Sequence, residues 1–171
     1  MRKTNLQIGV GLKSILKSIV FSFLVIPGFE QSIPKDSLLL GQTPPGNTPE
    51  KFHLSVKQGF FAAERIAISN DGRDIYHSEL KGYYPNTGES IKKYSYSNGK
   101  WTSPVTLFEG YAAPSLSVNG DTMYVETNFE TYLSVKNGSV WTKPKKILNS
   151  FESAHYYQVT RNGNYYITSK S

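Results

Sequence analysis

A hairpin unit that recurs three times constrains the fold of this chain more than any other feature. Each copy has a short stretch of alternating apolar and polar residues, a tight Asn-Gly or Asp-Gly turn, and a second such stretch. The copies cover residues 64–76, 115–124 and 158–166. Asn-Gly and Asp-Gly turns between alternating stretches are a strong short-range signal for antiparallel hairpins. The region after Glu64 is therefore predicted to be all-β.

Two sets of landmarks give the length of the repeat. The turn glycines Gly72, Gly120 and Gly163 are 48 and 43 residues apart, and Trp101 and Trp141 are 40 apart. The proline three residues after each tryptophan follows the same spacing. A period of about 40 to 45 residues with four strands is the pattern of a β-propeller blade. Helical repeats of similar length are excluded by the alternation and the density of turns.

The residues around the first turn resemble a known family. Residues 70–76, Asn-Asp-Gly-Arg-Asp-Ile-Tyr, and residues 99–104, Gly-Lys-Trp-Thr-Ser-Pro, are similar to the WD-like repeats of TolB-like propellers. Residues 40–52 resemble the lead-in that many exported bacterial members carry before their first blade. The resemblance covers residues 38–171 and implies a six- to eight-bladed propeller outside the cytoplasm. It carries over no catalytic residue and no cofactor.

The repeat predicts an incomplete propeller of about two and a half four-stranded antiparallel blades. The predicted segments are an extended lead-in with prolines and glycines (33–63), blade one (64–112), blade two (113–153) and a partial blade three (154–171). Closed propellers use at least about four blades, and an open row leaves strand edges and an apolar face in water. We expect a fragment of a longer protein, with self-association through the open blade edges as the alternative.

The first 32 residues predict an export signal or signal anchor. Four basic residues and no carboxylate precede an apolar run at residues 19–26. A positive segment before a short apolar run is typical of an export signal, and the run is shorter than the roughly 20 residues that span a bilayer. No Ala-x-Ala site follows, so a cut near Ser32 and an uncleaved anchor over residues 15–28 both stay open. The predicted location is periplasmic or secreted.

Charge and cysteine content exclude several classes of protein. The net charge is +6, but four positive charges precede the first acidic residue, Glu30. The rest of the chain has 15 Lys and Arg against 13 Asp and Glu, and only Lys143, Lys145 and Lys146 cluster. A phosphate-binding face needs clustered positive charge, so nucleic-acid binding is not predicted. The absence of cysteine excludes thiol catalysis, disulfides and thiolate metal sites.

The repeated aromatic residues have two readings. Tyr76, Tyr124 and Tyr166 occupy matching positions in the second strand of each unit, and Trp101 and Trp141 each follow a turn. Aromatic side chains of this kind can form a ligand platform. Recurrence in every unit instead favours packing between blades, because a binding site seldom needs the same residue in each repeat.

No motif for catalysis, a cofactor or a metal ion is present. The histidines, isolated in the sequence, are His53, His77 and His155. The carboxylates that flank the turns are Asp71, Asp74 and Asp121. They are expected to stabilise the turns, since neither a calcium loop nor an Asp-box is found. No Gly-x-Ser-x-Gly occurs either.

The predicted function is a binding or scaffold module outside the cytoplasm, with no catalytic machinery of its own. Its ligand would be a protein, peptide or glycan that the sequence does not identify. The alternative is a remnant of a propeller-containing enzyme, either the gating propeller of a peptidase or a glycan hydrolase or lyase. A truncated product without independent activity is the third reading.

Overall fold

The structure, a computed structural model, describes residues 32–44, 46–83, 86–147 and 155–168. All described residues belong to one compact unit, which covers residues 32–171. Residues 1–31 of the predicted export segment therefore lie outside the described residues. Of the described helices, none is long and apolar enough to span a membrane.

The prediction of an all-β fold is confirmed. One 3-10 helix, η1 (Lys35–Gly41), precedes strands that pair only in antiparallel fashion in the described part of the chain. No residue after η1 is helical within the described ranges. The alternating stretches seen in the sequence form the strands because one face of each strand packs against other parts of the chain.

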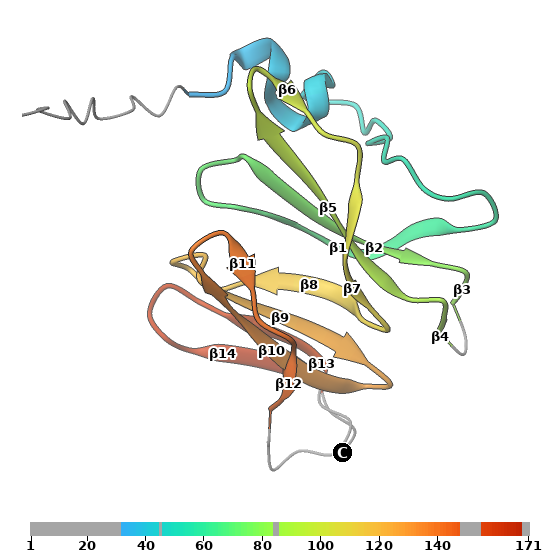
Figure 1. Cartoon of the computed structure of the whole chain (residues 1–171), viewed down its shortest axis with the longest axis vertical. Helices are drawn as coiled ribbons and strands as arrows, with labels where there is room; N and C mark the ends of the chain where they lie inside the picture. The colour runs from blue at the N-terminus through green and yellow to red at the C-terminus, as the bar shows by residue number, and fades with distance from the viewer. Residues whose placement is uncertain (1–31, 45, 84–85, 148–154, 169–171) are drawn as a thin grey trace, which may run out of the picture. The chain divides into compact units, whose positions relative to one another are not determined.

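The first sheet contains five strands (Figure 1). They are β1 (Phe61–Ile68), β2 (Asp74–Leu80), β5 (Ser90–Ser97), β6 (Lys100–Trp101) and β7 (Val105–Glu109). β6 pairs with the end of β5 and β7 with its beginning, so the two form one outer strand interrupted at residues 102–104. Pro104 lies in this interruption and has no N–H for the ladder. A small hairpin, β3 (Gly82–Tyr83) and β4 (Asn86–Thr87), lies between β2 and β5.

The second sheet repeats this order, and a hairpin follows it. Its strands are β8 (Ala112–Leu116), β9 (Thr122–Thr127), β10 (Glu130–Asn137), β11 (Val140–Trp141) and β12 (Lys145–Lys146). β11 and β12 again share one edge of β10. The hairpin consists of β13 (His155–Val159) and β14 (Tyr165–Thr168). We call the first sheet, the second sheet and this hairpin the three units.

The three predicted turns have the same hydrogen bonds. In each unit the turn glycine donates its N–H to the carbonyl three residues earlier, at 2.8–3.0 Å. Gly72, Gly120 and Gly163 have φ of 72°, 74° and 81°, a conformation that glycine adopts without steric cost. A hydroxyl side chain begins each turn and contacts its polar side chains, and these residues are Ser69, Ser117 and Thr160.

The first strand of each unit contains a β-bulge with a left-handed residue. Glu64, Ala113 and Tyr156 have φ of 65°, 52° and 57°, and a register shift occurs at each of them. None is Gly, Asn or Asp, the residues that tolerate this conformation best. The bulge is therefore imposed by the surroundings of the strand and not by its local sequence.

A side chain of the preceding unit binds the backbone of two of these bulges. Ser78 Oγ accepts the N–H of Ala113 at 2.8 Å, and a carboxylate oxygen of Glu126 accepts the N–H of Tyr156. Ser78 and Glu126 are equivalent, because each lies two residues after the repeated tyrosine in the second strand of its unit. These two bonds connect each unit to the next through the same pair of positions.

Replacement of Ser78 by alanine is expected to lower the free energy of unfolding by about 1–3 kcal/mol, because the buried N–H of Ala113 would lose its acceptor. Urea unfolding of the two proteins measures the difference. The matched control is Ser103→Ala in an exposed loop, which is expected to change little. Equal effects of the two substitutions would contradict a connecting role for Ser78.

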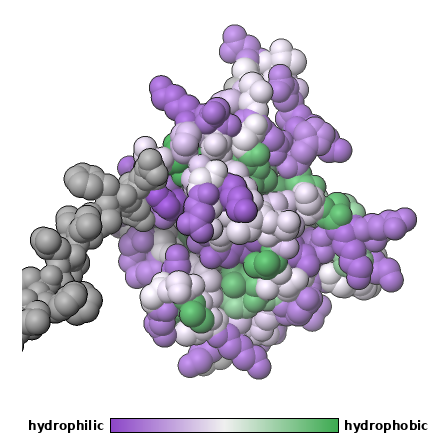
Figure 2. Space-filling model, turned by 45° about the horizontal axis from the view of Figure 1, so that its top comes forward, coloured by the Kyte–Doolittle hydropathy of each residue, from purple (hydrophilic) through white to green (hydrophobic). Residues whose placement is uncertain are grey.

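The main core lies between the two sheets. Tyr76, Ile91, Met123, Val125 and Trp141 form one buried cluster. The indole of Trp141 meets the ring of Tyr76 edge-on with centroids 6.1 Å apart, and its Nε1–H donates to the Tyr76 hydroxyl at 3.3 Å. The face of the molecule in Figure 2 is mostly hydrophilic, with hydrophobic residues in small separate areas.

The opposite face of the first sheet is covered by the segment that precedes β1 (Figure 1). Because β1 begins at Phe61, the name lead-in is used from here on for this segment, residues 33–60. Trp101 Nε1–H donates to the carbonyl of Ser37, and the N–H of Ser55 donates to the Tyr94 hydroxyl, both at 2.7 Å. Trp101 and Trp141 hold the same position in their sheets. Because Trp141 contacts the first sheet and Trp101 contacts the lead-in, the lead-in takes the position of a preceding sheet.

Candidate functional site

A pocket lies beside the first strands of the three units. It has a volume of about 430 Å³ and is lined by residues from β1, from β8 and from the β13–β14 hairpin. Its polar lining residues are Arg65, Asn70, Ser115, Ser117, Gln158 and Arg161. Ile66, Ile68 and Val118 contribute exposed aliphatic side chains. We call this site the inner-strand pocket, and its size falls in the range of small-molecule sites.

Equivalent positions of the three units supply much of the lining. The residues opposite the repeated tyrosines are Ala67, Ser115 and Gln158. The residues that follow the turn hydroxyls are Asn70, Val118 and Arg161. All six line the inner-strand pocket. The repeat therefore determines the position of the pocket, while the side chains that differ between the units determine its chemistry.

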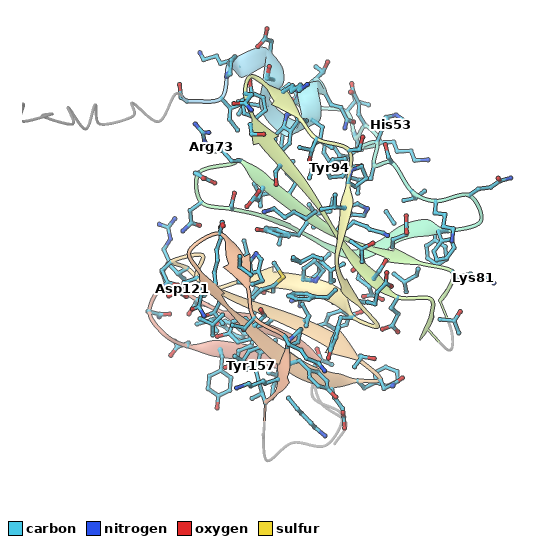
Figure 3. The ribbon with its side chains drawn as sticks, viewed as in Figure 1. His53, Arg73, Lys81, Tyr94, Asp121 and Tyr157 are labelled. Carbon is cyan, nitrogen blue, oxygen red and sulfur yellow. The ribbon has the colours of Figure 1, made fainter. Side chains whose placement is uncertain are left out.

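The turns of the first and second units meet at this site. The side-chain amide of Asn70 donates to the carbonyl of Val118 at 2.8 Å. Arg73 and Asp121, which lie in these two turns, are seen at the same end of the sheets in Figure 3. This contact fixes one rim of the inner-strand pocket.

Arg65 anchors the third unit on the first. Its guanidinium donates to the carbonyls of Tyr156 at 3.0 Å and Tyr157 at 3.2 Å, and it lies 4.9 Å from the centre of the Tyr156 ring. These bonds use two of the five N–H donors that a guanidinium carries. Arg65 is thus held in position by β13 while it lines the inner-strand pocket.

Two carboxylates lie near Arg65 but do not line the pocket. The Tyr156 hydroxyl donates to Glu64 at 2.7 Å. Glu126 is 9% exposed and accepts the N–H of Tyr156. Burial, together with the nearby charge of Glu64, raises the pKa of Glu126 to about 7, although the hydrogen bond from Tyr156 and the charge of Arg65 act in the opposite direction. The contact between the second and third units therefore includes a group that titrates near neutral pH.

The repeated tyrosines pack between successive units where a following unit is described. Tyr76 is 0% exposed between the two sheets, and Tyr124 lies against Tyr157 with ring centroids 4.6 Å apart. Tyr166 holds the same position in the third unit and is 64% exposed. These side chains are not among the residues that line the inner-strand pocket, so the packing interpretation explains Tyr76 and Tyr124.

His77 and His53 lie on different elements. His77 is 1% exposed beneath the lead-in, where its ring stacks on Tyr94 with centroids 5.6 Å apart. Burial lowers the pKa of His77 to about 4, against the opposing charge of Glu79. His53 belongs to the lead-in, and its backbone exchanges two hydrogen bonds with the Gln42 side chain. His155 lies in β13, and its side chain is outside the described residues.

Neither ring nitrogen of His77 has a hydrogen-bond partner among the described residues. The equivalent residue of the second sheet is the apolar Val125. A buried polar group without a partner costs about 1–3 kcal/mol. We therefore expect His77→Leu, which preserves most of the volume, to raise the free energy of unfolding at pH 7 by about 1 kcal/mol.

Thermal and urea unfolding of His77→Leu measure this effect. The matched control is Tyr94→Phe, which removes the acceptor of the Ser55 N–H under the same part of the lead-in. This control is expected to destabilise the protein by about 1 kcal/mol. A loss of stability in His77→Leu would show that the imidazole makes a favourable contribution at this position.

The turn carboxylates form hydrogen bonds or ion pairs with other residues of the chain. Asp71 accepts the N–H of Arg73 at 3.1 Å, and Asp121 accepts the Ser117 hydroxyl at 3.1 Å. Asp74 accepts the Tyr76 hydroxyl and pairs with Lys93 and Lys136. Within the described ranges, no group of three or more His, Asp and Glu residues could hold a metal ion.

A second pocket of about 740 Å³ lies between the lead-in and β1. It is lined by Leu39, Phe52 and His53 together with Ile66 and Ile68 of β1. The charges of the adjacent lining residues Glu50 and Lys51 oppose each other. This pocket involves one unit and the lead-in, whereas the inner-strand pocket is built by all three units.

The sequence did not indicate the inner-strand pocket. Arg65 and Arg161 belong to different units and carry no motif, and only the antiparallel pairing and the bulges bring them to one site. The one available signal was that turn residues of successive repeats lie at the same end of their sheets. Comparisons of the chain with models of protein families, with curated proteins and with solved structures find no match.

Proposed function

We propose that this chain is a β-propeller-type binding module that acts outside the cytoplasm and recognises its ligand in the inner-strand pocket. The order of strands in the two sheets supports the propeller assignment, because both place four strand positions side by side and pack face to face. In propellers such sheets surround a central channel. The turn motif at residues 70–76 supports membership of the TolB-like group, and the basic and apolar pattern of residues 1–26 supports export.

The observation that carries the proposal is which equivalent positions have the same residue in successive units and which have different residues. The aromatic positions that pack units together keep their residue type, as at Tyr76 and Tyr124. Positions that line the inner-strand pocket differ from unit to unit, as at Ala67, Ser115 and Gln158. Ala67 is part of the buried core, but Ser115 and Gln158 are partly or fully exposed, and exposed lining positions of this kind can be adapted to a ligand. Concave sites with a few polar groups are the usual binding sites of proteins.

Peptide and glycan arrays probed with the full chain test this proposal. The variant Ser115→Tyr places a large side chain in the inner-strand pocket, and Ser103→Tyr makes the same change in an exposed loop outside it. We expect the array ligands of the unmodified chain to lose at least about tenfold in affinity with Ser115→Tyr, a change of about 1.4 kcal/mol. The Ser103→Tyr protein should retain them.

Circular dichroism and urea unfolding establish that both variants are folded before they are compared. Array ligands that bind the Ser115→Tyr protein as well as the unmodified chain would contradict the assignment of the pocket. A folded sample that binds no peptide or glycan would contradict the proposal for these two classes of ligand.

A further inference from the structure

The inner-strand pocket has an unbalanced charge. Among the residues that the structure describes, Arg65 and Arg161 are its charged lining residues, and no aspartate or glutamate lines it. Among the described residues neither guanidinium takes part in an ion pair. Guanidinium groups match the planar geometry of a carboxylate and bind it with two parallel hydrogen bonds.

Arg65 is prepared to bind an anion without reorganisation. Its contacts with the two β13 carbonyls and the ring of Tyr156 hold it in place, and three of its donors are not used by these bonds. The nearest carboxylates are directed to other donors, since Glu64 accepts the Tyr156 hydroxyl and Glu126 accepts the Tyr156 N–H. A ligand would therefore not have to displace a described carboxylate from an ion pair with Arg65.

The remaining lining suits a ligand with an apolar body. Gln158 and Ser115 provide neutral hydrogen-bond donors, while Ile66, Ile68 and Val118 expose aliphatic surface. Inorganic anions would leave this aliphatic surface in water. A carboxylate attached to a hydrocarbon group would use both parts of the pocket.

We propose that the inner-strand pocket binds an organic carboxylate, with Arg65 and Arg161 holding the charged group and the aliphatic residues of β1 and the second turn holding its apolar part. This inference rests on the proposed function and specifies the chemical class of the ligand. Arg161 is exposed, and its side chain has no hydrogen bond to another described residue, so we expect that its charge can be removed without disturbing the units.

Backbone NMR titrations of the full chain test the inference with two probes of equal size, hexanoate and hexanamide. We expect hexanoate to shift the amide signals of Ser115, Gln158 and Arg161. Hexanamide is expected to bind at least about tenfold more weakly than hexanoate. Arg161→Gln should weaken hexanoate binding about three- to tenfold. The control Lys100→Gln removes the same charge at an exposed position outside the pocket and should have no effect.

Three results would overturn the inference. Equal binding of hexanoate and hexanamide at these residues would show that charge is not recognised, while the proposed role of the pocket would stand. Equal weakening by Arg161→Gln and Lys100→Gln would show a general effect of net charge. Binding of inorganic phosphate at these residues without binding of hexanoate would show that an apolar body is not part of the recognised ligand.

Discussion

The substitution Tyr76→Ala is expected to lower the free energy of unfolding by about 3–5 kcal/mol, the usual range for removal of a large aromatic side chain from a core. Tyr76 is fully buried between the two sheets, and it provides both the ring that Trp141 contacts and the oxygen that accepts its indole N–H. The substitution removes this contact and leaves a cavity between the sheets. Urea unfolding, followed by tryptophan fluorescence and circular dichroism, measures the loss.

The repeat provides a matched control for this experiment. Tyr166→Ala makes the same chemical change at the equivalent position of the third unit, where the side chain is 64% exposed. It is expected to change the free energy of unfolding by about 0.5 kcal/mol or less. Similar effects of the two substitutions would contradict the packing of the two sheets through Tyr76.

The stability of the protein between pH 4.5 and 6.5 is expected to depend on two opposing groups. Glu126 has a pKa raised to about 7, so its folded form binds more protons than its unfolded form, and stability falls as pH rises from 4.5 to 7. His77 has a pKa lowered to about 4, so its unfolded form binds more protons, and stability rises as pH rises from 4 to 6.5. Each slope amounts to about 1.4 kcal/mol per pH unit at its steepest.

Single substitutions should separate the two slopes. In the unmodified protein they largely cancel between pH 4.5 and 6.5. In His77→Leu the free energy of unfolding should fall with rising pH across this window, by about 2–3 kcal/mol. In Glu126→Gln it should rise by a similar amount, because the slope of His77 then remains alone.

Urea unfolding at half-unit steps of pH measures these profiles. The double variant His77→Leu/Glu126→Gln is the control and should restore a flat profile, because both titrating groups are absent. Parallel profiles for the two single variants would show that burial does not shift these groups in opposite directions.

Local sequence was sufficient to predict the strands and turns. Gly72, Gly120 and Gly163 each follow Asn or Asp and lie between alternating stretches, and all three turns are present. The equivalence of Tyr76 and Tyr124 could be predicted for the same reason, because turn type and the two-residue period of a strand determine which residues face each other. These relations involve residues that are close in the chain.

The bulges in the first strands could not be predicted in this way. Glu64, Ala113 and Tyr156 are not residues that favour a left-handed conformation. At Ala113 and Tyr156 the bulge backbone binds a side chain of the preceding unit, Ser78 and Glu126 respectively. An isolated strand has no such partner, so the local sequence carries no signal for the bulge.

The candidate site could not be predicted from the sequence either. Arg65 and Arg161 stand in unrelated local patterns, and they line one pocket because the strands of the first and third units lie side by side, where β13 carbonyls accept hydrogen bonds from the Arg65 guanidinium. The buried position of His77 also depends on the lead-in, most of which has no regular secondary structure. The sequence places His77 next to a predicted turn but gives no signal of its burial.

An all-β chain of repeated hairpins could be predicted from the order of residues, because turn chemistry and the alternation of apolar residues act over a few neighbouring positions. The packing of the units determines which sheet faces are covered, that Glu126 and His77 are buried, and that Arg65 and Arg161 line the same pocket. Those outcomes depend on contacts between units far apart in the chain, and such contacts arise from the packing of whole sheets and not from the residues adjacent to each side chain.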